Sequence, residues 1–346
     1  MDLTSSHPLQ RYWDLASARL QAHALEHAIN MGLLHHFESP ATPSAVAHRL
    51  QLAPDATAAF LELLWSMEIL QRTPTSSSSS EAFTYQLTPV ASRYLLDTGE
   101  HSCALAWRFR MQALETCGQN LSAFLEGRMT GNDAEYAPSE QAWAEAAKTQ
   151  IAQEQSSVTA PAVAQLLKQK IDIPATGRFL DLGGGPGFIS IALAHQYPGW
   201  TGTLFDWPAT AEVAAGNIQA AGLNSRLSTC GGDATRDDLG GTYDLIWCSS
   251  VLHFLPDLDL ALQRFWTALQ PGGLLICAHA EIGTTPDNAL KSLPFYLPLM
   301  LRGHYVPHQG ELPNALKRNG FEYLSTHALT HSPMTPVQIH TGRKPE

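Results

Sequence analysis

The segment Arg178–Phe188, which reads RFLDLGGGPGF, constrains the fold of this 346-residue chain more than any other stretch. It has the pattern of a buried strand that ends in an acid, followed by a tight glycine turn and the start of a helix. Glycine lets a backbone turn sharply and approach a ligand closely, and the amides of a helix N-terminus point toward that ligand. The segment therefore predicts the first unit of a sheet that binds a ligand at the carboxyl ends of its strands.

Strand and helix patterns alternate after residue 177. This alternation predicts an α/β domain with a doubly wound, mostly parallel, Rossmann-like sheet. The expected strands lie at 178–182, 202–206, 226–230, 243–249, 273–279, 321–328 and 336–342. The expected helices lie at 187–196, 208–221, 257–269 and 309–319.

The first hundred residues have a different pattern. Helical spacing of apolar residues is followed by two short strand patterns that flank the serine tract 76–80, which predicts a mainly α winged-helix domain with a flexible wing tip. The expected helices lie at 9–37, 42–50 and 57–69, and the strands at 69–73 and 83–87. The third helix has no Lys or Arg between Arg49 and Arg72, so we expect it to serve a protein interface rather than to read DNA.

We therefore expect three parts, a winged-helix dimerisation domain at 1–100, a helical connector at 101–172 and a catalytic domain at 173–346. The connector is expected to contribute to a substrate pocket together with side chains that follow the fifth strand of the sheet. The candidate pocket residues are Trp107, Phe109, Met111, Trp143, Phe295, Tyr296, Met300 and His304.

The formal net charge of −11, without a basic stripe, argues against binding to nucleic acid or to an anionic membrane. No apolar run approaches the roughly 20 residues of a membrane span, and the N-terminus lacks the pattern of a signal peptide. The five cysteines show no CxxC spacing, which favours free thiols and a cytoplasmic location.

Three acids at successive strand ends indicate the cofactor. A dinucleotide fingerprint would need glycine at 188, where Phe188 stands, so an NAD-dependent oxidoreductase is disfavoured. Asp181 beside the turn would repel a pyrophosphate but attract an ammonium group, and S-adenosylmethionine (SAM) has an ammonium and no phosphate. Asp206, 19 residues after Gly187, is placed to accept ribose hydroxyls, Trp207 to stack on adenine, and Asp233 to accept from the adenine amino group. Taken singly, each acid could instead be a helix cap or turn residue.

These motifs resemble a known family over nearly the whole chain. The segments 179–187 (FLDLGGGPG), 204–208 (LFDWP), 251–253 (VLH) and 87–94 (LTPVASRY) are similar to class I SAM-dependent O-methyltransferases of the plant caffeate type and their bacterial small-molecule relatives. The resemblance implies an intertwined homodimer whose N-terminal domain lends residues to the partner's pocket, and His253 as catalytic base. It also implies cofactor contacts at Asp181, Gly183, Gly185, Asp206, Trp207, Asp233, Ala234 and Ser249.

The chain departs from this family around the expected base. The Asp-Trp pair that follows the family's histidine is Phe254-Leu255 here, and the family's supporting glutamate aligns with His279, with Glu281 on the same strand face. A second supporting glutamate falls near Val306, between His304 and His308. The orienting carboxylates are thus expected to be replaced by imidazoles.

Three hypotheses follow. The first is transfer of a methyl group from SAM to a hydroxyl or similar heteroatom of a small, aromatic acceptor, with His253 as base. The second keeps the fold and SAM but adds iron or zinc for C-methylation of a 2-oxo acid, with His253, His279, His304 and His308 as candidate ligands. The third is a winged-helix DNA-binding regulator that senses SAM, against which the missing basic helix speaks.

Overall fold

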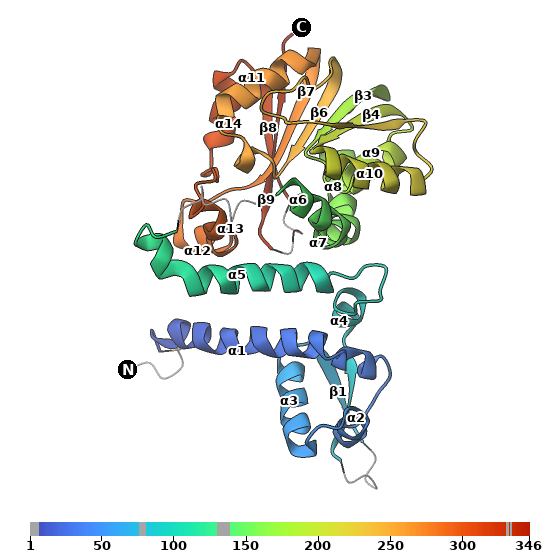
Figure 1. Ribbon diagram of the computed structural model, residues 1–346, viewed down its shortest axis with the longest axis vertical. Helices are drawn as coiled ribbons and strands as arrows, with labels where there is room; N and C mark the ends of the chain where they lie inside the picture. Colours follow the sequence, from blue (N-terminus) through green and yellow to red (C-terminus); the bar gives the residue numbers. More distant parts are fainter. Residues whose placement is uncertain (1–6, 76–80, 130–138, 330–331, 333) are drawn as a thin grey trace. The chain divides into compact units, whose positions relative to one another are not determined.

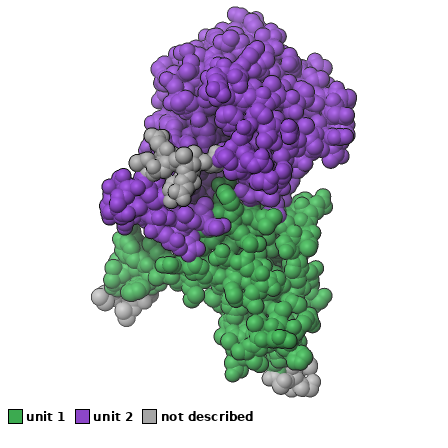
Figure 2. All heavy atoms as spheres, in the orientation of Figure 1, with its two compact units in different colours: residues 1–111 green, residues 112–346 purple. Residues whose placement is uncertain are grey.

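The computed structural model describes residues 7–75, 81–129, 139–329, 332 and 334–346. The chain divides into two compact units, residues 1–111 and 112–346 (Figure 2). The serine tract 76–80, predicted as a wing tip, lies outside the described residues. In the described part of the chain, no helix combines the length and the apolar character that crossing a membrane requires.

The first unit has the predicted order of three helices and a strand hairpin (Figure 1). Its elements are α1 (Gln10–Asn30), η1 (Leu33–Phe37), α2 (Pro43–Leu50), α3 (Pro54–Ser66), β1 (Leu70–Pro74), β2 (Phe83–Leu87) and α4 (Pro89–Tyr94). The helix expected at 9–37 is interrupted, because Gly32 takes a left-handed conformation with φ of 64°. Thr42 caps α2 by accepting a hydrogen bond from the Ala45 amide, and Pro43 stands at the first helical position. Helix α5 (Ala104–Leu125) begins in this unit and continues into the second.

The second unit contains a seven-stranded sheet in the order β5-β4-β3-β6-β7-β9-β8. The strands are β3 (Thr176–Leu182), β4 (Gly199–Asp206), β5 (Leu227–Gly231), β6 (Tyr243–Ser249), β7 (Leu269–Ala280), β8 (Glu322–Leu329) and β9 (Val337–Arg343). The five strands β5, β4, β3, β6 and β7 pair in parallel in this order, and β9 runs antiparallel between β7 and β8. The predicted mostly parallel, doubly wound sheet is confirmed. Its chain order reverses between β3 and β6, so ligands are expected outside the carboxyl ends of these strands.

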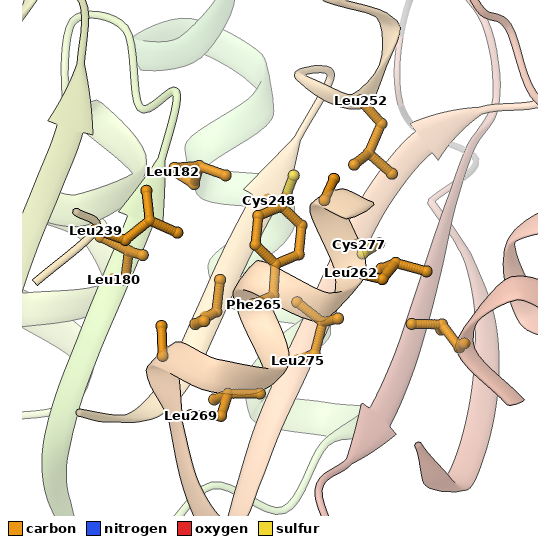
Figure 3. Close-up of a cluster of buried hydrophobic side chains, with 14 of the residues drawn as sticks. Leu180, Leu182, Leu239, Cys248, Leu252, Leu262, Phe265, Leu269, Leu275 and Cys277 are labelled. Atoms are coloured by element: carbon orange, nitrogen blue, oxygen red, sulfur yellow. The ribbon is translucent and has the colours of Figure 1, made fainter. Parts of the chain in front are cut away.

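Helices cover both faces of this sheet, because alternate residues of the buried strands point to opposite sides (Figure 1). On one face, Leu180 and Cys248 pack with Phe265 of α11 (Figure 3). Leu312 of α14 belongs to the same cluster. On the other face, Phe179 and Trp247 pack with helices α8 to α10. The helices of this unit are α6 (Glu140–Lys148), α7 (Gln150–Glu154), η2 (Gln155–Thr159), α8 (Ala160–Lys170), α9 (Phe188–Gln196), α10 (Pro208–Ala220), η3 (Leu252–Phe254), α11 (Leu258–Ala268), α12 (Pro286–Leu290), α13 (Leu293–Met300) and α14 (Glu311–Arg318).

Candidate active site

The glycine turn between β3 and α9 admits no larger residue at its start. Gly183 has a φ of 64°, and its amide donates to the Phe205 carbonyl at 2.7 Å, which ties the turn to β4. A Cβ atom at Gly183 would lie 2.1 Å from Val251 Cγ2. The turn therefore needs glycine for its conformation and for the close approach of Val251.

Asp181 is buried at the end of β3, just before the turn. Its Oδ2 accepts a hydrogen bond from Ser190 Oγ at 2.6 Å. Burial raises the pKa of Asp181 to about 7, the hydrogen bond from Ser190 opposes this shift, and the nearby charge of Asp206 adds to it. In the ligand-free chain this acid is therefore close to half ionised at neutral pH.

Asp206 ends the neighbouring strand β4 and is held by two backbone amides. Gly185 N donates to Oδ2 at 2.8 Å and Trp207 N donates to Oδ1 at 2.7 Å. Burial nevertheless raises the pKa of Asp206 to about 6. The structure thus brings two predicted cofactor acids together with Gly185, while the Trp207 side chain next to them remains 39% exposed. A ligand with a cation and hydroxyl donors suits two adjacent acids that form no ion pair with any described side chain.

Asp233 differs from these two acids because its carboxylate is used within its own loop. Oδ1 accepts from the Thr235 amide at 2.9 Å and from the Thr235 hydroxyl at 2.7 Å, and Oδ2 lies 3.2 Å from Arg236 Nε. The hydrogen bonds from Thr235 lower the pKa of Asp233. Ala234 is half-buried in the same loop, and Ser249 is half-buried at the end of β6. Asp233 thus acts as a turn residue, which the sequence left open as an alternative to cofactor binding. Its contact with adenine stays a prediction.

His253 lies in the 3₁₀ turn η3 after β6, and its side chain is buried. Its Nδ1 lies 2.8 Å from the Tyr305 carbonyl oxygen, which can only accept, so Nδ1 carries a proton and donates. Nε2 is buried and has no hydrogen-bond partner among the described residues. Burial lowers the pKa of His253 below its usual value. The imidazole is therefore neutral at neutral pH, with the lone pair of Nε2 available.

Aromatic rings surround this imidazole. The ring centroid of His253 lies 5.1 Å from that of His279 and 5.2 Å from that of Tyr296. Phe254 extends the group, with centroids 5.1 Å from both Trp143 and His304. Of the expected pocket residues, Trp143, Tyr296 and His304 thus gather around the turn 252–254, and Phe295 and Met300 pack in the apolar cluster that contains Tyr296. Trp107, Phe109 and Met111 belong to the other unit, and their pocket role stays a prediction.

His279 is fully buried on β7, and neither of its ring nitrogens has a partner among the described residues. Burial lowers its pKa well below the usual value. Glu281 does not orient His253, because its Oε1 binds His340 Nε2 at 2.8 Å. His340 Nδ1 in turn lies 2.9 Å from Thr326 Oγ1, so a polar chain runs from Glu281, just after β7, through His340 of β9 to β8.

These side chains do not fit a metal centre. His253 uses Nδ1 on the Tyr305 carbonyl, and His308 is exposed. Within the ranges that the structure describes, no group of three or more His, Cys, Asp or Glu side chains could hold a metal ion. The arrangement of His253, His279, His304 and His308 therefore does not support the iron or zinc hypothesis.

Gln155, at the start of the π-helical turn η2, is a site residue that was not predicted from the sequence. Its side chain contacts the glycine turn, where Nε2 donates to the Gly184 carbonyl at 3.1 Å and Oε1 accepts from the Phe188 amide at 3.2 Å. A π-helical turn often marks a functional site, but it leaves no hydrophobic period in the sequence that would reveal it.

Comparison with known structures establishes the class of fold. Human N-acetylserotonin methyltransferase, solved with SAM, matches with a TM-score of 0.78 at 19% identity, covering 100% of both chains. PigF, solved with S-adenosylhomocysteine (SAH), matches with a TM-score of 0.73 at 19% identity, covering 97% of this chain and 99% of that one. The fold is that of the class I SAM-dependent methyltransferases.

Sequence comparison identifies the family. The O-methyltransferase domain profile matches residues 135–322, and the O-methyltransferase dimerisation domain profile matches residues 13–97. The chain therefore belongs to the O-methyltransferase family and is a SAM-dependent methyltransferase.

Individual relatives are more distant. The N,N-dimethyltransferase OxyT of Streptomyces rimosus is 25% identical over 271 residues, covering 76% of this chain and 75% of that protein. Demethylspheroidene O-methyltransferase of Cereibacter sphaeroides is 32% identical over 163 residues, covering 46% of this chain and 43% of that protein. The 3-hydroxy-5-methyl-1-naphthoate 3-O-methyltransferase of Streptomyces sahachiroi is 34% identical over 90 residues, which is 26% of each protein. The last two matches thus span less than half of each relative.

Proposed function

We propose that this protein transfers the methyl group of SAM to a hydroxyl group of a small aromatic metabolite, with His253 as the general base. The names of the O-methyltransferase relatives support a hydroxyl acceptor, and the rings of Trp143, Phe254 and Tyr296 near His253 support a planar, apolar one. Aromatic side chains of this kind position flat ligands by edge and face contacts.

The observation that carries the proposal is the state of His253. The Tyr305 carbonyl holds the proton on Nδ1, which leaves Nε2 as an acceptor, and burial keeps the ring neutral. A neutral imidazole whose second nitrogen is fixed by a hydrogen bond is the form required of a base. In the proposed reaction, Nε2 accepts the proton of the acceptor hydroxyl as the oxygen forms its bond to the methyl carbon.

When bound, SAM supplies an electrophilic methyl group whose bond to sulfur breaks, with both electrons going to sulfur. The contribution of this chain is to hold the two reactants in line, which can account for much of the rate. We assign Asp181 to the ammonium end of SAM through its charge, and Asp206 to the ribose hydroxyls. The backbone of the glycine turn, at Gly183 and Gly185, would lie against the same ligand.

We also propose that the enzyme is a homodimer formed through the N-terminal unit. The match of residues 13–97 to a dimerisation domain supports this, as does a row of exposed apolar side chains on and beside the first half of α1. These are Leu9, Tyr12, Trp13, Leu15 and Leu20. Exposed apolar patches of this kind mark interaction surfaces.

Substitution of the base tests the proposal. Methyl-labelled SAM is incubated with the protein and a panel of phenols, naphthols and hydroxylated heteroaromatic acids, and the product is characterised by mass spectrometry and NMR. On an accepted substrate, His253→Ala is expected to lower kcat by about 10²- to 10⁴-fold, the usual contribution of a general base. His308→Ala, which removes an exposed histidine, serves as the matched control and is expected to retain full activity. Unchanged turnover in His253→Ala, or methylation at a ring carbon, would refute the proposal.

A further inference from the structure

The glycine turn between β3 and α9, which we propose to meet the cofactor, has few side chains that could fix its backbone. Gly183, Gly185 and Gly187 all have positive φ angles, and Gly187 is the N-cap residue of α9. Because glycine has no side chain, α9 lacks an internal N-cap, and the amides of its first turn need acceptors from elsewhere. A flexible turn would have to be ordered whenever the cofactor binds, which costs binding free energy.

Gln155 supplies an acceptor to the first turn of α9, and a donor to the glycine turn, from a different element. Its Oε1 accepts from Phe188 N at the first position of α9, and its Nε2 donates to the Gly184 carbonyl. One side-chain amide therefore spans the turn from one end to the other. The Gly184 carbonyl also accepts from Gly187 N at 3.1 Å, so the Gln155 contact is a second bond on an already closed turn.

The segment that carries Gln155 is built to reach this turn. Gln155 begins the π-helical turn η2, which packs against α9 and α8. A Cβ atom built on Gly185 would have Gln155 Nε2 at 3.5 Å and Ile151 Cγ2 at 3.6 Å as its nearest neighbours. Gly185 is also the residue whose amide holds Asp206. The Gly184 carbonyl and the Gly185 amide belong to the same peptide group, so Gln155 and Asp206 hold that group from its two sides.

We propose that Gln155 is a positioning residue for the cofactor, which fixes the glycine turn in the conformation that receives the amino-acid end of SAM. This inference rests on the proposed placement of that end of SAM beside Asp181 and the turn. Gln155 acts on the ligand through the backbone of Gly184 and Phe188. Its loss weakens binding of ligands that carry the amino-acid chain and spares ligands that consist of the nucleoside half alone.

Calorimetric titrations at pH 8 with two ligands separate binding of the amino-acid end from binding of the nucleoside half. The probes are SAH, which has the amino-acid chain, and 5′-methylthioadenosine, which lacks it. Gln155→Met keeps the length of the side chain and removes both hydrogen bonds. Two hydrogen bonds of ordinary net strength correspond to about a ten-fold rise in the Kd for SAH. The Kd for methylthioadenosine is expected to stay within about two-fold, because Asp206 keeps its hydrogen bonds from the Gly185 and Trp207 amides.

Gln196→Met is the matched control, since Gln196 lies at the far end of α9 and binds Tyr197 there. It is expected to leave both Kd values unchanged, and acceptor KM is expected to be unchanged in both variants. Equal losses for the two probes in Gln155→Met, an unchanged Kd for SAH or tighter SAH binding would overturn the inference. A wild-type protein that binds methylthioadenosine and SAH equally well would instead contradict the proposed placement of the amino-acid end, and one that binds neither probe would contradict the cofactor site itself.

Discussion

At the scale of single residues, the proposed chemistry depends on which nitrogen of His253 carries the proton. The sequence predicted that imidazoles replace the carboxylates that orient the base in related enzymes. The structure instead places the backbone carbonyl of Tyr305, 52 residues away, on His253 Nδ1. A backbone carbonyl is present at every residue, so sequence cannot reveal this contact. The pairing of Glu281 with His340 was also not predicted. It depends on the antiparallel insertion of β9 beside β7, which the sequence pattern does not show.

The raised pKa values of the two cofactor acids predict how SAH affinity depends on pH. Asp181 and Asp206 have pKa values of about 7 and about 6 in the ligand-free chain. In the proposed site the ionised Asp181 attracts the ammonium group and the ionised Asp206 accepts hydrogen bonds from the ribose hydroxyls. We therefore expect binding to release the protons that the two acids carry below these pKa values. We expect SAH affinity to fall at least ten-fold between pH 8 and pH 5.5, measured by titration calorimetry. At pH 6.5, heats recorded in two buffers of different ionisation enthalpy should show proton release. Affinity that is constant over this range would contradict the prediction.

The same shifts affect stability in a definite direction. A carboxyl group whose pKa is raised on folding holds its proton more tightly in the folded chain, so its contribution to stability is lost as pH rises from about 4 to about 7. Ligand-free protein at pH 8 thus contains buried, ionised acids that a bound cation would neutralise. The rise in melting temperature caused by saturating SAH should therefore be larger at pH 8 than at pH 6. A larger rise at pH 6 would show that these acids do not face the ligand.

At the scale of elements, the hydrophobic pattern predicted those strands and helices whose burial gives a regular spacing of apolar residues. All seven strands of the sheet were predicted. The five parallel strands are recognisable because buried parallel strands form short apolar runs. Helices α12 and α13 were not predicted as helices. Helix α12 has only five residues, too few to show a helical period. Helix α13 is apolar on every side and contains Pro298, so its sequence shows neither an amphipathic period nor an uninterrupted helical pattern. The role of Gln155 was missed because its partners lie 29 and 33 residues away on another element.

The glycine turn offers a direct test of packing at the end of β3. Gly183→Ala would add a methyl group to a left-handed residue and force it into Val251. Gly222 has a similar φ of 69° with no neighbour within 4 Å of its added Cβ, so Gly222→Ala reports the cost of the conformation alone. In urea unfolding we expect Gly222→Ala to lose about 1 kcal/mol and Gly183→Ala to lose about 1–3 kcal/mol more. Equal losses would mean that the turn can move away from Val251.

At the scale of the whole molecule, the N-terminal unit was expected to form an interface, and its surface supports that role. Trp13 is 68% exposed and Leu20 is 63% exposed on α1, although both are large apolar side chains. Buried tryptophans commonly dominate the binding energy of an interface. Trp13→Glu is therefore expected to raise the dimer dissociation constant at least ten-fold in analytical ultracentrifugation. Gln219→Glu, which adds the same charge on the exposed face of α10, should have no effect. Equal behaviour of the two variants would place the interface elsewhere.

The class of enzyme could be predicted from sequence because its cofactor motif is short and local, within the chain from Asp181 to Asp233. The acceptor could not, because its pocket was expected to combine residues of the helical connector with residues of the catalytic domain, and relatives in this family act on different atoms. The relatives include an N,N-dimethyltransferase and an L-tyrosine C(3)-methyltransferase beside the O-methyltransferases. The side chains around His253 thus favour a class of acceptor, small and aromatic, but do not identify one compound.

The central claim is that the acids at the ends of β3 and β4 bind SAM, and titration of SAH at pH 8 into Asp206→Asn tests it most directly. Asparagine keeps the shape of the side chain and its carbonyl acceptor but removes the charge. We expect one saturable site per chain in the wild-type protein, at least ten-fold weaker binding in Asp206→Asn, and no change in Asp172→Asn, which alters an exposed acid before β3. Wild-type protein without saturable binding, or Asp206→Asn with wild-type affinity, would contradict the account.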